Sequence, residues 1–369
     1  MSNLHAVAAQ GQSIWLDSIS QELLKPAGLP RMMKDDAITG VTSNPSIFAA
    51  AIMGSADYDR PLGDMAARGA STDEIYTALV TGDIQAACDV MRPVFDRTDG
   101  VDGYVSVEVS PDLAHDTAAT VAEAREWVKR VDRPNLLIKV PATAEGIPAV
   151  RQLITEGTSV NVTLIFALER YREVMEAYLS GLEGLAAVGG DVSRVASVAS
   201  FFVSRVDTEV DTRLEGIGTD DALALRGKAA IANARAAYGA FLEMFSGDRW
   251  EALTDKGARI QRPLWASTST KNPAYRDVMY VEDLVAPDTV NTVPISTIDA
   301  YQDHGSSDPK VFTSADIAAA VATLDQLASV GIDYDDVVQV LEDEGVRKFA
   351  DAYHQLLASI DEKRLALAG

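Results

Sequence analysis

The sequence predicts a (β/α)8 barrel, the TIM-barrel fold of the α/β class, with additional helices and a helical C-terminal tail. Eight short apolar segments of strand type recur along the chain, and segments with helical periodicity separate them. A strand followed by a helix, repeated eight times, is typical of a closed parallel barrel. The runner-up is a doubly wound sheet with a helical appendage. It would be favoured by a glycine-rich turn after the first strand, and residues 17–20 are not such a turn.

Each predicted strand is a short apolar or alternating run. In chain order these runs are 14–17, 37–41, 104–109, 135–140, 160–166, 195–202, 263–267 and 289–294. Between them, apolar residues spaced three or four apart predict helices at 113–131, 144–156 and 168–188.

Two stretches exceed a minimal barrel of about 250 residues. They are a helical region at 204–253 and a helical C-terminal extension at 314–369. No repeat, proline-rich linker or low-complexity tract marks a boundary, so residues 1–369 are interpreted as one barrel domain. In the extension, Ser314 is a candidate helix cap. Apolar stripes follow it, and such stripes are usually packing faces: Ile317, Val321 and Leu324, then Phe349, Tyr353, Leu356, Leu357 and Ile360.

The composition narrows the function classes. Lys plus Arg total 32 against 55 Asp plus Glu, giving a formal charge of -23. That charge opposes loose adhesion to nucleic acid or to an anionic membrane, so neither is an expected partner. Cys88 is the single cysteine, no apolar run reaches the length of a membrane span, and the N-terminus lacks the features of a signal peptide. A cytoplasmic location is expected.

Lys139 is the most informative single residue. It lies within the apolar run 136–141, LLIKVP, at the end of a predicted strand. Desolvation there disfavours the charged ammonium, which leaves a fraction of neutral amine able to attack a carbonyl. The alternative is a strand-end lysine whose ammonium extends to water.

Further polar residues stand at other strand ends, where barrel enzymes place their chemistry. Asp17 and Glu108 could supply the acid and base that a Schiff-base reaction needs. Each could instead pair with an arginine, and Asp17 could cap a helix. Pro45 forces Asn44 towards an extended conformation, which could aim its amide inward, although Asn before Pro is also an ordinary turn element.

Three segments in order carry a family resemblance. They are 40–46 (GVTSNPS), 138–143 (IKVPAT) followed by Glu145-Gly146, and 161–166 (NVTLIF). The chain resembles the transaldolase family over about residues 14 to 300 and is similar in length to its long actinobacterial members. Three ordered motifs are far more specific than one.

The resemblance implies a role for each residue. Lys139 would form the Schiff base, and Asp17 would accept the substrate hydroxyl proton during carbon–carbon cleavage. Glu108 and Thr163 would hold the water that relays protons. The residues implied to hold the dihydroxyacetone unit are Asn44, Asn161 and Ser200.

The implied phosphate site departs from the family pattern. Arg205 and Ser267 match phosphate-binding residues, but Ser269 stands where the family usually has an arginine. We therefore expect Lys271 to supply the missing charge, as a point charge rather than a bidentate fork.

The resemblance implies the pentose phosphate reaction: transfer of a dihydroxyacetone unit from sedoheptulose 7-phosphate to glyceraldehyde 3-phosphate, which gives erythrose 4-phosphate and fructose 6-phosphate. Sugar phosphates are the expected ligands, with no cofactor and no metal, and the chain is expected to be a monomer or homodimer. Two alternatives remain at this point: a fructose-6-phosphate aldolase-like enzyme, and a non-catalytic sugar-phosphate-binding barrel.

Overall fold

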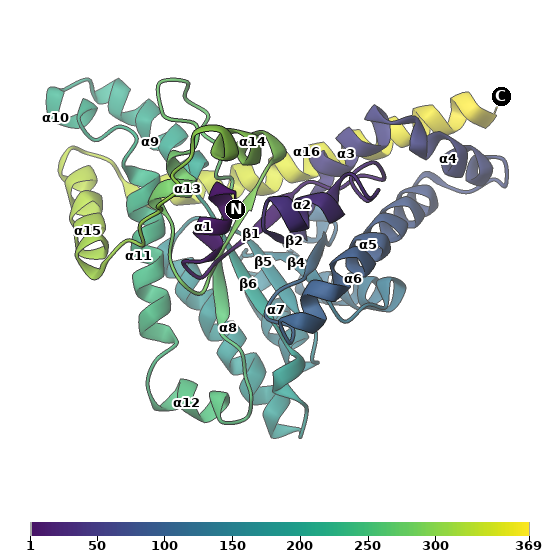
Figure 1. The fold of residues 1–369 in the computed structure, drawn as a ribbon, viewed down its shortest axis with the longest axis horizontal. Coiled ribbons are helices and arrows are strands. Elements are labelled where there is room, and N and C mark those ends of the chain that lie inside the picture. Colours follow the sequence, from purple (N-terminus) through teal and green to yellow (C-terminus); the bar gives the residue numbers. More distant parts are fainter. Residues whose placement is uncertain (1, 369) are drawn as a thin grey trace.

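Eight parallel strands close into one barrel in the computed structural model of the chain, which describes residues 2–368 and side chains to residue 366. The strands follow one another around the barrel in sequence order, so the predicted (β/α)8 fold is confirmed (Figure 1). All eight predicted strands are present, with ends shifted by one or two residues. They are β1 (Gln12–Asp17), β2 (Ile38–Thr42), β3 (Val105–Glu108), β4 (Leu136–Pro141), β5 (Val160–Ile165), β6 (Ser197–Phe202), β7 (Gln261–Ala266) and β8 (Thr289–Val293).

Helices surround the barrel, and the three predicted ones are α6, α7 and α8. The first part of the chain forms α1 (Asn3–Ala8), α2 (Leu29–Asp35), α3 (Pro45–Gly54), α4 (Asp59–Ala66) and α5 (Thr72–Arg97). The middle forms α6 (Thr117–Val131), α7 (Gly146–Thr155) and α8 (Leu168–Ala187). Short 3₁₀ turns lie at Ala56–Tyr58, Pro111–Leu113 and Val192–Arg194.

The two predicted additions are helical. The connection from β6 to β7 contains α9 (Ser204–Ile217), α10 (Asp220–Leu223), α11 (Ala229–Met244) and α12 (Asp248–Thr254). Around β8 lie α13 (Met279–Asp283) and α14 (Ile295–His304), and the tail forms α15 (Ser314–Ser329) and α16 (Tyr334–Ala368). The prediction that Ser314 caps a helix is wrong by one residue. Thr313 is the cap, because its hydroxyl accepts from the Asp316 N–H while the Asp316 carboxylate accepts from the Thr313 N–H.

A polar layer closes the N-terminal end of the barrel. Trp15 is fully buried and its Nε1 donates to Asp102 at 2.6 Å, while Arg262 pairs with the same carboxylate at 3.4 Å. A Cβ added at Gly40 would come within 2.5 Å of the Trp15 ring. Packing against Trp15 therefore requires glycine at position 40. The polar residues that follow in the 40–46 motif lie at the opposite, C-terminal end of the barrel.

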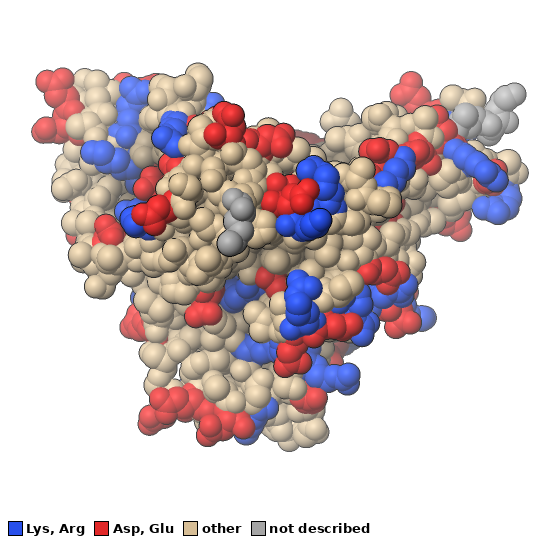
Figure 2. All heavy atoms as spheres, in the orientation of Figure 1, with Lys and Arg blue, Asp and Glu red and all other residues tan. Residues whose placement is uncertain are grey.

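Acidic and basic side chains are interspersed over the face drawn in Figure 2. Among the described helices, none alone is long and apolar enough to cross a membrane. Only α15 and α16 together meet that length and composition test, as a pair bent by 97°.

Candidate active site

One cavity of about 210 Å³ lies at the C-terminal ends of the strands. The rings of Phe202 and Phe349 form two apolar parts of its wall. Eight of the ten predicted site residues line it: Asp17, Asn44, Lys139, Thr163, Ser200, Arg205, Ser267 and Lys271. The other two, Glu108 and Asn161, lie directly beside it, as described below.

The strand register brings the central residues together. Glu108 on β3 is opposite Lys139 on β4, and Lys139 is opposite Asn161 on β5. Residues opposite one another on neighbouring parallel strands lie side by side at the same height in the barrel. Three residues separated by up to 53 positions in the sequence therefore form one row.

Lys139 is buried in that row, with only 5% of its surface exposed. Its Nζ donates to the backbone oxygen of Ser43 at 2.9 Å and lies 3.5 Å from a carboxylate oxygen of Glu108. The alternative of an ammonium that extends to water is therefore wrong for this fold. The amine is instead held at a fixed point inside the cavity, which suits a nucleophile.

Asp17 lies across the cavity at the end of β1. Its Oδ1 accepts a hydrogen bond from the Thr42 hydroxyl at 2.7 Å, and Thr42 in turn contacts the Thr292 hydroxyl at 2.5 Å. Burial raises the pKa of Asp17, while the Thr42 hydrogen bond and the charge of Lys139 act in the opposite direction. A carboxylate with a raised pKa is a better base near neutral pH, which is where a proton acceptor is needed.

Glu108 is the second acid of the site and is buried. Burial raises its pKa from 4.5 to about 7, although the neighbouring Lys139 charge opposes the shift. Neither of its carboxylate oxygens has a hydrogen-bond partner among the described residues, and the same holds for the buried hydroxyl of Thr163. Glu108 can therefore hold or release a proton near pH 7 beside the Lys139 amine.

This shift predicts a pH-dependent stability. The native pKa of Glu108 lies above its ordinary value of 4.5, so its contribution to folding is complete below that value and is lost as pH rises through about 7. The Glu108→Gln variant cannot ionise at this position. We expect the free energy of unfolding of the wild type to fall relative to that of the variant as pH rises from 4.5 to about 7. Urea titration at several pH values measures this difference.

A matched control separates this effect from general charge removal. Glu22 is an exposed glutamate on the surface. The free energy of unfolding of Glu22→Gln, plotted against pH, should run parallel to that of the wild type. Parallel curves for Glu108→Gln would contradict the assigned environment of Glu108.

The end of β2 supplies three consecutive contacts. The Thr42 hydroxyl donates a hydrogen bond to Asp17, and the Ser43 carbonyl accepts one from Lys139. Asn44 is the N-terminal cap of α3. The Asn44 backbone is extended, with φ -156° and ψ 170°, as the following proline predicted. Its Oδ1 accepts from the Ile47 N–H at 3.0 Å, which fixes the amide at the cavity wall.

Asn161 is fully buried beside the cavity and does not line it. Its Nδ2 donates to the Ser106 hydroxyl at 3.1 Å and its Oδ1 accepts from the Ser200 hydroxyl at 2.7 Å. Ser200 does line the cavity. In this structure Asn161 therefore orients Ser200, and its predicted direct role in holding substrate stays a prediction.

The backbone is strained at two points of the site. Leu164, which follows Thr163, has a φ of +62°, and the pairing of β5 with β6 is irregular between Val162 and Ile165. Ser267 has a φ of +57°. Such values are costly for residues with a side chain, and they are typical of functional sites where neighbouring structure holds the backbone in place.

Positive charge gathers at one side of the cavity. Arg205 at the start of α9 places its guanidinium 5.1 Å from the centre of the Phe202 ring, and its buried Nη1 has no hydrogen-bond partner among the described residues. Burial lowers the pKa of Arg205, and burial together with the Arg205 charge lowers that of Lys271. The two cations and the Ser267 hydroxyl thus form one pole suited to an anion.

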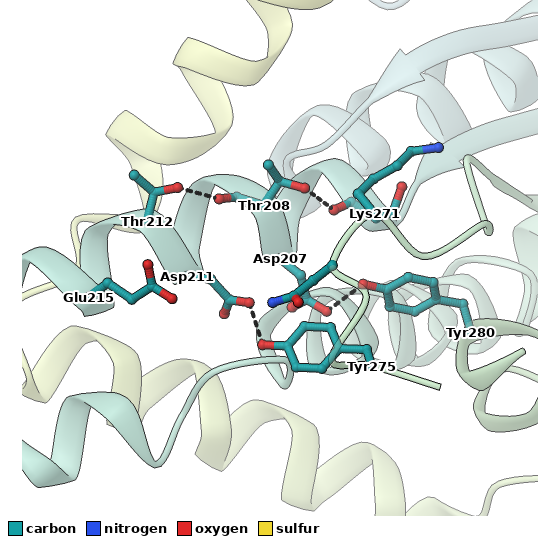
Figure 3. Close-up of a pocket in the computed structure, with 10 residues that line it drawn as sticks. Asp207, Thr208, Asp211, Thr212, Glu215, Lys271, Tyr275 and Tyr280 are labelled. Carbon is teal, nitrogen blue, oxygen red and sulfur yellow. Dashed lines mark hydrogen bonds between the residues drawn. The ribbon is translucent and has the colours of Figure 1, made fainter. Parts of the chain in front are cut away.

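An acidic groove adjoins this pole on the outer side of Lys271 (Figure 3). There Tyr280 donates to Asp207 at 2.7 Å and Tyr275 donates to Asp211 at 2.5 Å. The second oxygen of each carboxylate accepts a backbone N–H. The Lys271 ammonium points away from these acids in Figure 3 and donates to Ser269 at 2.7 Å. The hydrogen-bonded acids therefore hold α9 against its neighbours, and the Lys271 ammonium lies on the side of the cavity.

Several residues that line the cavity or support it were not predicted from the sequence as site residues. Thr42 and Thr292 support Asp17, and Ser106 supports Asn161. Thr42 was detectable in principle because it stands inside the 40–46 motif. Phe349 comes from α16. Its apolar stripe is typical of packing, and the sequence made this residue a candidate only on the condition that the tail reaches the cavity. Among the described residues, no group of three or more His, Cys, Asp or Glu side chains has the arrangement of a metal site.

The chain is similar to known proteins over most of its length. Residues 14–360 match the family model described as Transaldolase/Fructose-6-phosphate aldolase. The chain is 53% identical to a protein named Transaldolase from Mycolicibacterium smegmatis, over 96% of this chain and 95% of that protein. It is 55% identical to the Transaldolase of Acidothermus cellulolyticus, over 97% and 95% of the two chains, and 53% identical to Transaldolase 1 of Streptomyces coelicolor, over 97% and 93%.

Proposed function

Because this chain belongs to the transaldolase/fructose-6-phosphate aldolase family and is an enzyme with transaldolase activity, we propose that Lys139 forms the Schiff base of that reaction. The observation that carries the proposal is the position of its amine. It is 5% exposed, 3.5 Å from Glu108, and shares a cavity with Asp17. A buried amine with one acid beside it and a second acid across the cavity has the groups that imine chemistry requires.

The first stage is imine formation. The neutral Lys139 amine adds to the ketone carbon of the donor sugar phosphate, and a carbinolamine results. Loss of its hydroxyl as water needs a proton, and Glu108, whose pKa is about 7, can give one at neutral pH. The Thr163 hydroxyl lines the same cavity and has no hydrogen-bond partner among the described residues, which supports a role in holding a relaying water.

The second stage is carbon–carbon cleavage and transfer. Asp17 removes the proton of the hydroxyl next to the scissile bond, the bond breaks, and the electron pair moves towards the iminium nitrogen. The first aldehyde leaves, while the three-carbon enamine stays on Lys139. Asn44 and Ser200 are positioned to hold its hydroxyl groups until the second aldehyde adds.

The anion pole is proposed to bind the phosphate of donor and acceptor. We expect Lys271→Met to raise KM for fructose 6-phosphate roughly tenfold or more, the cost of one charged hydrogen bond. Unphosphorylated fructose, which leaves the pole empty, should be turned over with little change. Steady-state kinetics with both donors checks this expectation.

Lys310→Met is the matched control, because Lys310 is an exposed lysine paired with Asp308 on the surface. It should leave both KM values as in the wild type. A Lys271→Met variant with an unchanged KM for the phosphorylated donor would move the phosphate contact to other residues.

Mass spectrometry after borohydride reduction tests the proposed function. The protein is incubated with fructose 6-phosphate and sodium borohydride, and its intact mass and peptide map are compared with a borohydride-free control. A reduced three-carbon adduct on the peptide containing Lys139 supports the proposal. Ligand binding without any adduct would overturn it in favour of the non-catalytic binding barrel.

Dependence on an acceptor separates transfer from simple aldol cleavage. A transaldolase forms product at a rate that depends on an added aldehyde, whereas a fructose-6-phosphate aldolase releases free dihydroxyacetone without one. We propose that sedoheptulose 7-phosphate and glyceraldehyde 3-phosphate are the natural pair, that the enzyme works in the cytoplasm, and that it acts as a monomer or homodimer. Neither nucleic acid nor membrane is proposed as a partner, given the net charge of -23.

A further inference from the structure

The C-terminal helix α16 lies across the end of the barrel that carries the cavity. It contacts α3, α4 and α5 on one side of the barrel mouth, α9 on another, and β5 between them. In Figure 1 it is the long yellow helix that passes from the region of α15 and α9 to the region of α3 and α4. A tail that the sequence presents as a packing element therefore forms part of the wall of the catalytic cavity.

Contacts along its length hold α16 in place. Near its start Asp336 pairs with Arg213 at 2.6 Å, and near its end Asp361 accepts from the Thr72 hydroxyl at 2.7 Å. Exposed pairs of this kind contribute little individually. The apolar face adds more, because Leu356 and Ile360 are completely buried. The middle of the helix is thus fixed over the barrel.

The helix approaches the barrel closely at Gly345. A Cβ at this position would lie 3.0 Å from Leu164 Cδ2 and 3.7 Å from Arg205 Nη1. Leu164 is the strained residue that follows Thr163 in β5. The absence of a side chain at Gly345 lets the helix rest directly on the strand end that carries Thr163, and this places the next turn of α16 over the cavity.

That next turn carries Phe349, which lines the cavity and is 7% exposed. The centre of its ring lies 5.8 Å from Lys139 Nζ and 5.8 Å from Arg205 Cζ. The ring therefore lies near both the nucleophilic amine and the cation of the anion pole. An aromatic face at this distance also attracts a positive charge, such as the iminium that forms on Lys139.

We propose that Phe349 is a specificity-determining residue, which excludes water from the three-carbon unit on Lys139 and thereby favours transfer over release. The inference rests on the Schiff-base function proposed above. Release of the unit requires a proton on the enamine carbon and then attack of water on the iminium carbon. The carbon–nitrogen bond breaks, and free dihydroxyacetone and the Lys139 amine result. Transfer consumes the enamine by attack on an aldehyde before those steps occur. An apolar ring beside the nitrogen occupies space through which water would approach.

The test is a partition ratio. With fructose 6-phosphate as donor, the rate of dihydroxyacetone release without acceptor is divided by the rate of transfer with a saturating acceptor aldehyde. Phe349→Ala is expected to raise this ratio by about tenfold or more, since a missing apolar group in a pocket changes discrimination by that order. Phe349→Leu, which keeps an apolar side chain of similar reach, should fall between Phe349→Ala and the wild type.

Leu356→Ala is the matched control. It truncates a fully buried residue two turns further along α16 that does not line the cavity, so it loosens the helix to a similar extent without opening the site. Its ratio should remain within about twofold of the wild type. An unchanged ratio in folded Phe349→Ala, or an equal rise in Leu356→Ala, would overturn the assignment to the Phe349 ring.

Two further readouts keep the test decisive. If Phe349→Ala does not fold by circular dichroism, Phe349→Leu and Phe349→Met provide the comparison, and ratios equal to the wild type in both would overturn the proposal. Borohydride trapping on the wild type is run in parallel. A missing adduct there would mean that the Schiff-base function itself fails, whereas an adduct with an unaltered partition ratio would mean that only the role of Phe349 fails.

Discussion

Replacing Lys139 with methionine is expected to reduce kcat by roughly four orders of magnitude or more, because the variant lacks the amine proposed to form the covalent intermediate. Methionine keeps the length and apolar stem of the lysine. The variant should still fold, since the loss of the ammonium leaves Glu108 free to become neutral in its buried position. Turnover of fructose 6-phosphate with an acceptor aldehyde measures the effect, and borohydride should trap no adduct.

The appropriate control for this variant is a lysine outside the cavity. Lys25 is half-exposed and pairs with Glu22 and Asp57 on the surface, so Lys25→Met should leave kcat and KM as in the wild type. Residual turnover in Lys139→Met within about tenfold of the wild type would show that the amine is not the nucleophile.

Replacing Asp17 with asparagine is expected to lower kcat by about two to four orders of magnitude, the range for loss of a general acid or base. Asparagine keeps the shape of the carboxylate and can still accept from the Thr42 hydroxyl, which donates to Asp17 at 2.7 Å. It cannot accept the proton of the substrate hydroxyl. Imine formation depends on Glu108 and Lys139, so the donor should still become attached while the carbon–carbon bond stays intact.

Trapping distinguishes these two stages directly. In the wild type, borohydride should capture a three-carbon adduct on Lys139, because cleavage precedes reduction. In Asp17→Asn it should capture the uncleaved six-carbon sugar phosphate on the same lysine. A three-carbon adduct in the variant at the wild-type rate would assign the proton acceptor to another group, and Glu108→Gln provides the comparison for a defect in imine formation.

The order of the strands and most of the predicted residues that line the cavity could be identified from the sequence. All eight strands were found because apolar runs of strand length are visible locally, and the repeated alternation with helices permits few folds other than a barrel. Lys139 stood out because it is a cation within the apolar run LLIKVP, and the other polar strand ends and the ordered motifs favoured a catalytic role over a lysine that extends to water. The C-terminal ends of parallel strands meet at one edge, so residues at those ends could be grouped before any coordinates.

The supporting contacts could not be predicted in the same way. Lys139 donates to the Ser43 carbonyl, and Asn161 makes hydrogen bonds with both Ser106 and Ser200. These contacts depend on the strand register and on the direction of each side chain. A shift of one residue in register would turn each side chain to the other face of the strand. Local sequence patterns fix the type of element but not these alignments.

What the sequence determined by itself was the barrel, and that Asp17, Glu108 and Lys139 stand in this order at the ends of its strands. What only the tertiary structure decided was the course of α16 and the position of Phe349 beside Lys139 and Arg205. The apolar stripe of α16 indicates that one face of the helix is buried, but it does not indicate which surface covers that face. That choice depends on contacts with α3, α5, α9 and β5, which are all more than a hundred residues away in the chain and become neighbours only when the barrel has closed.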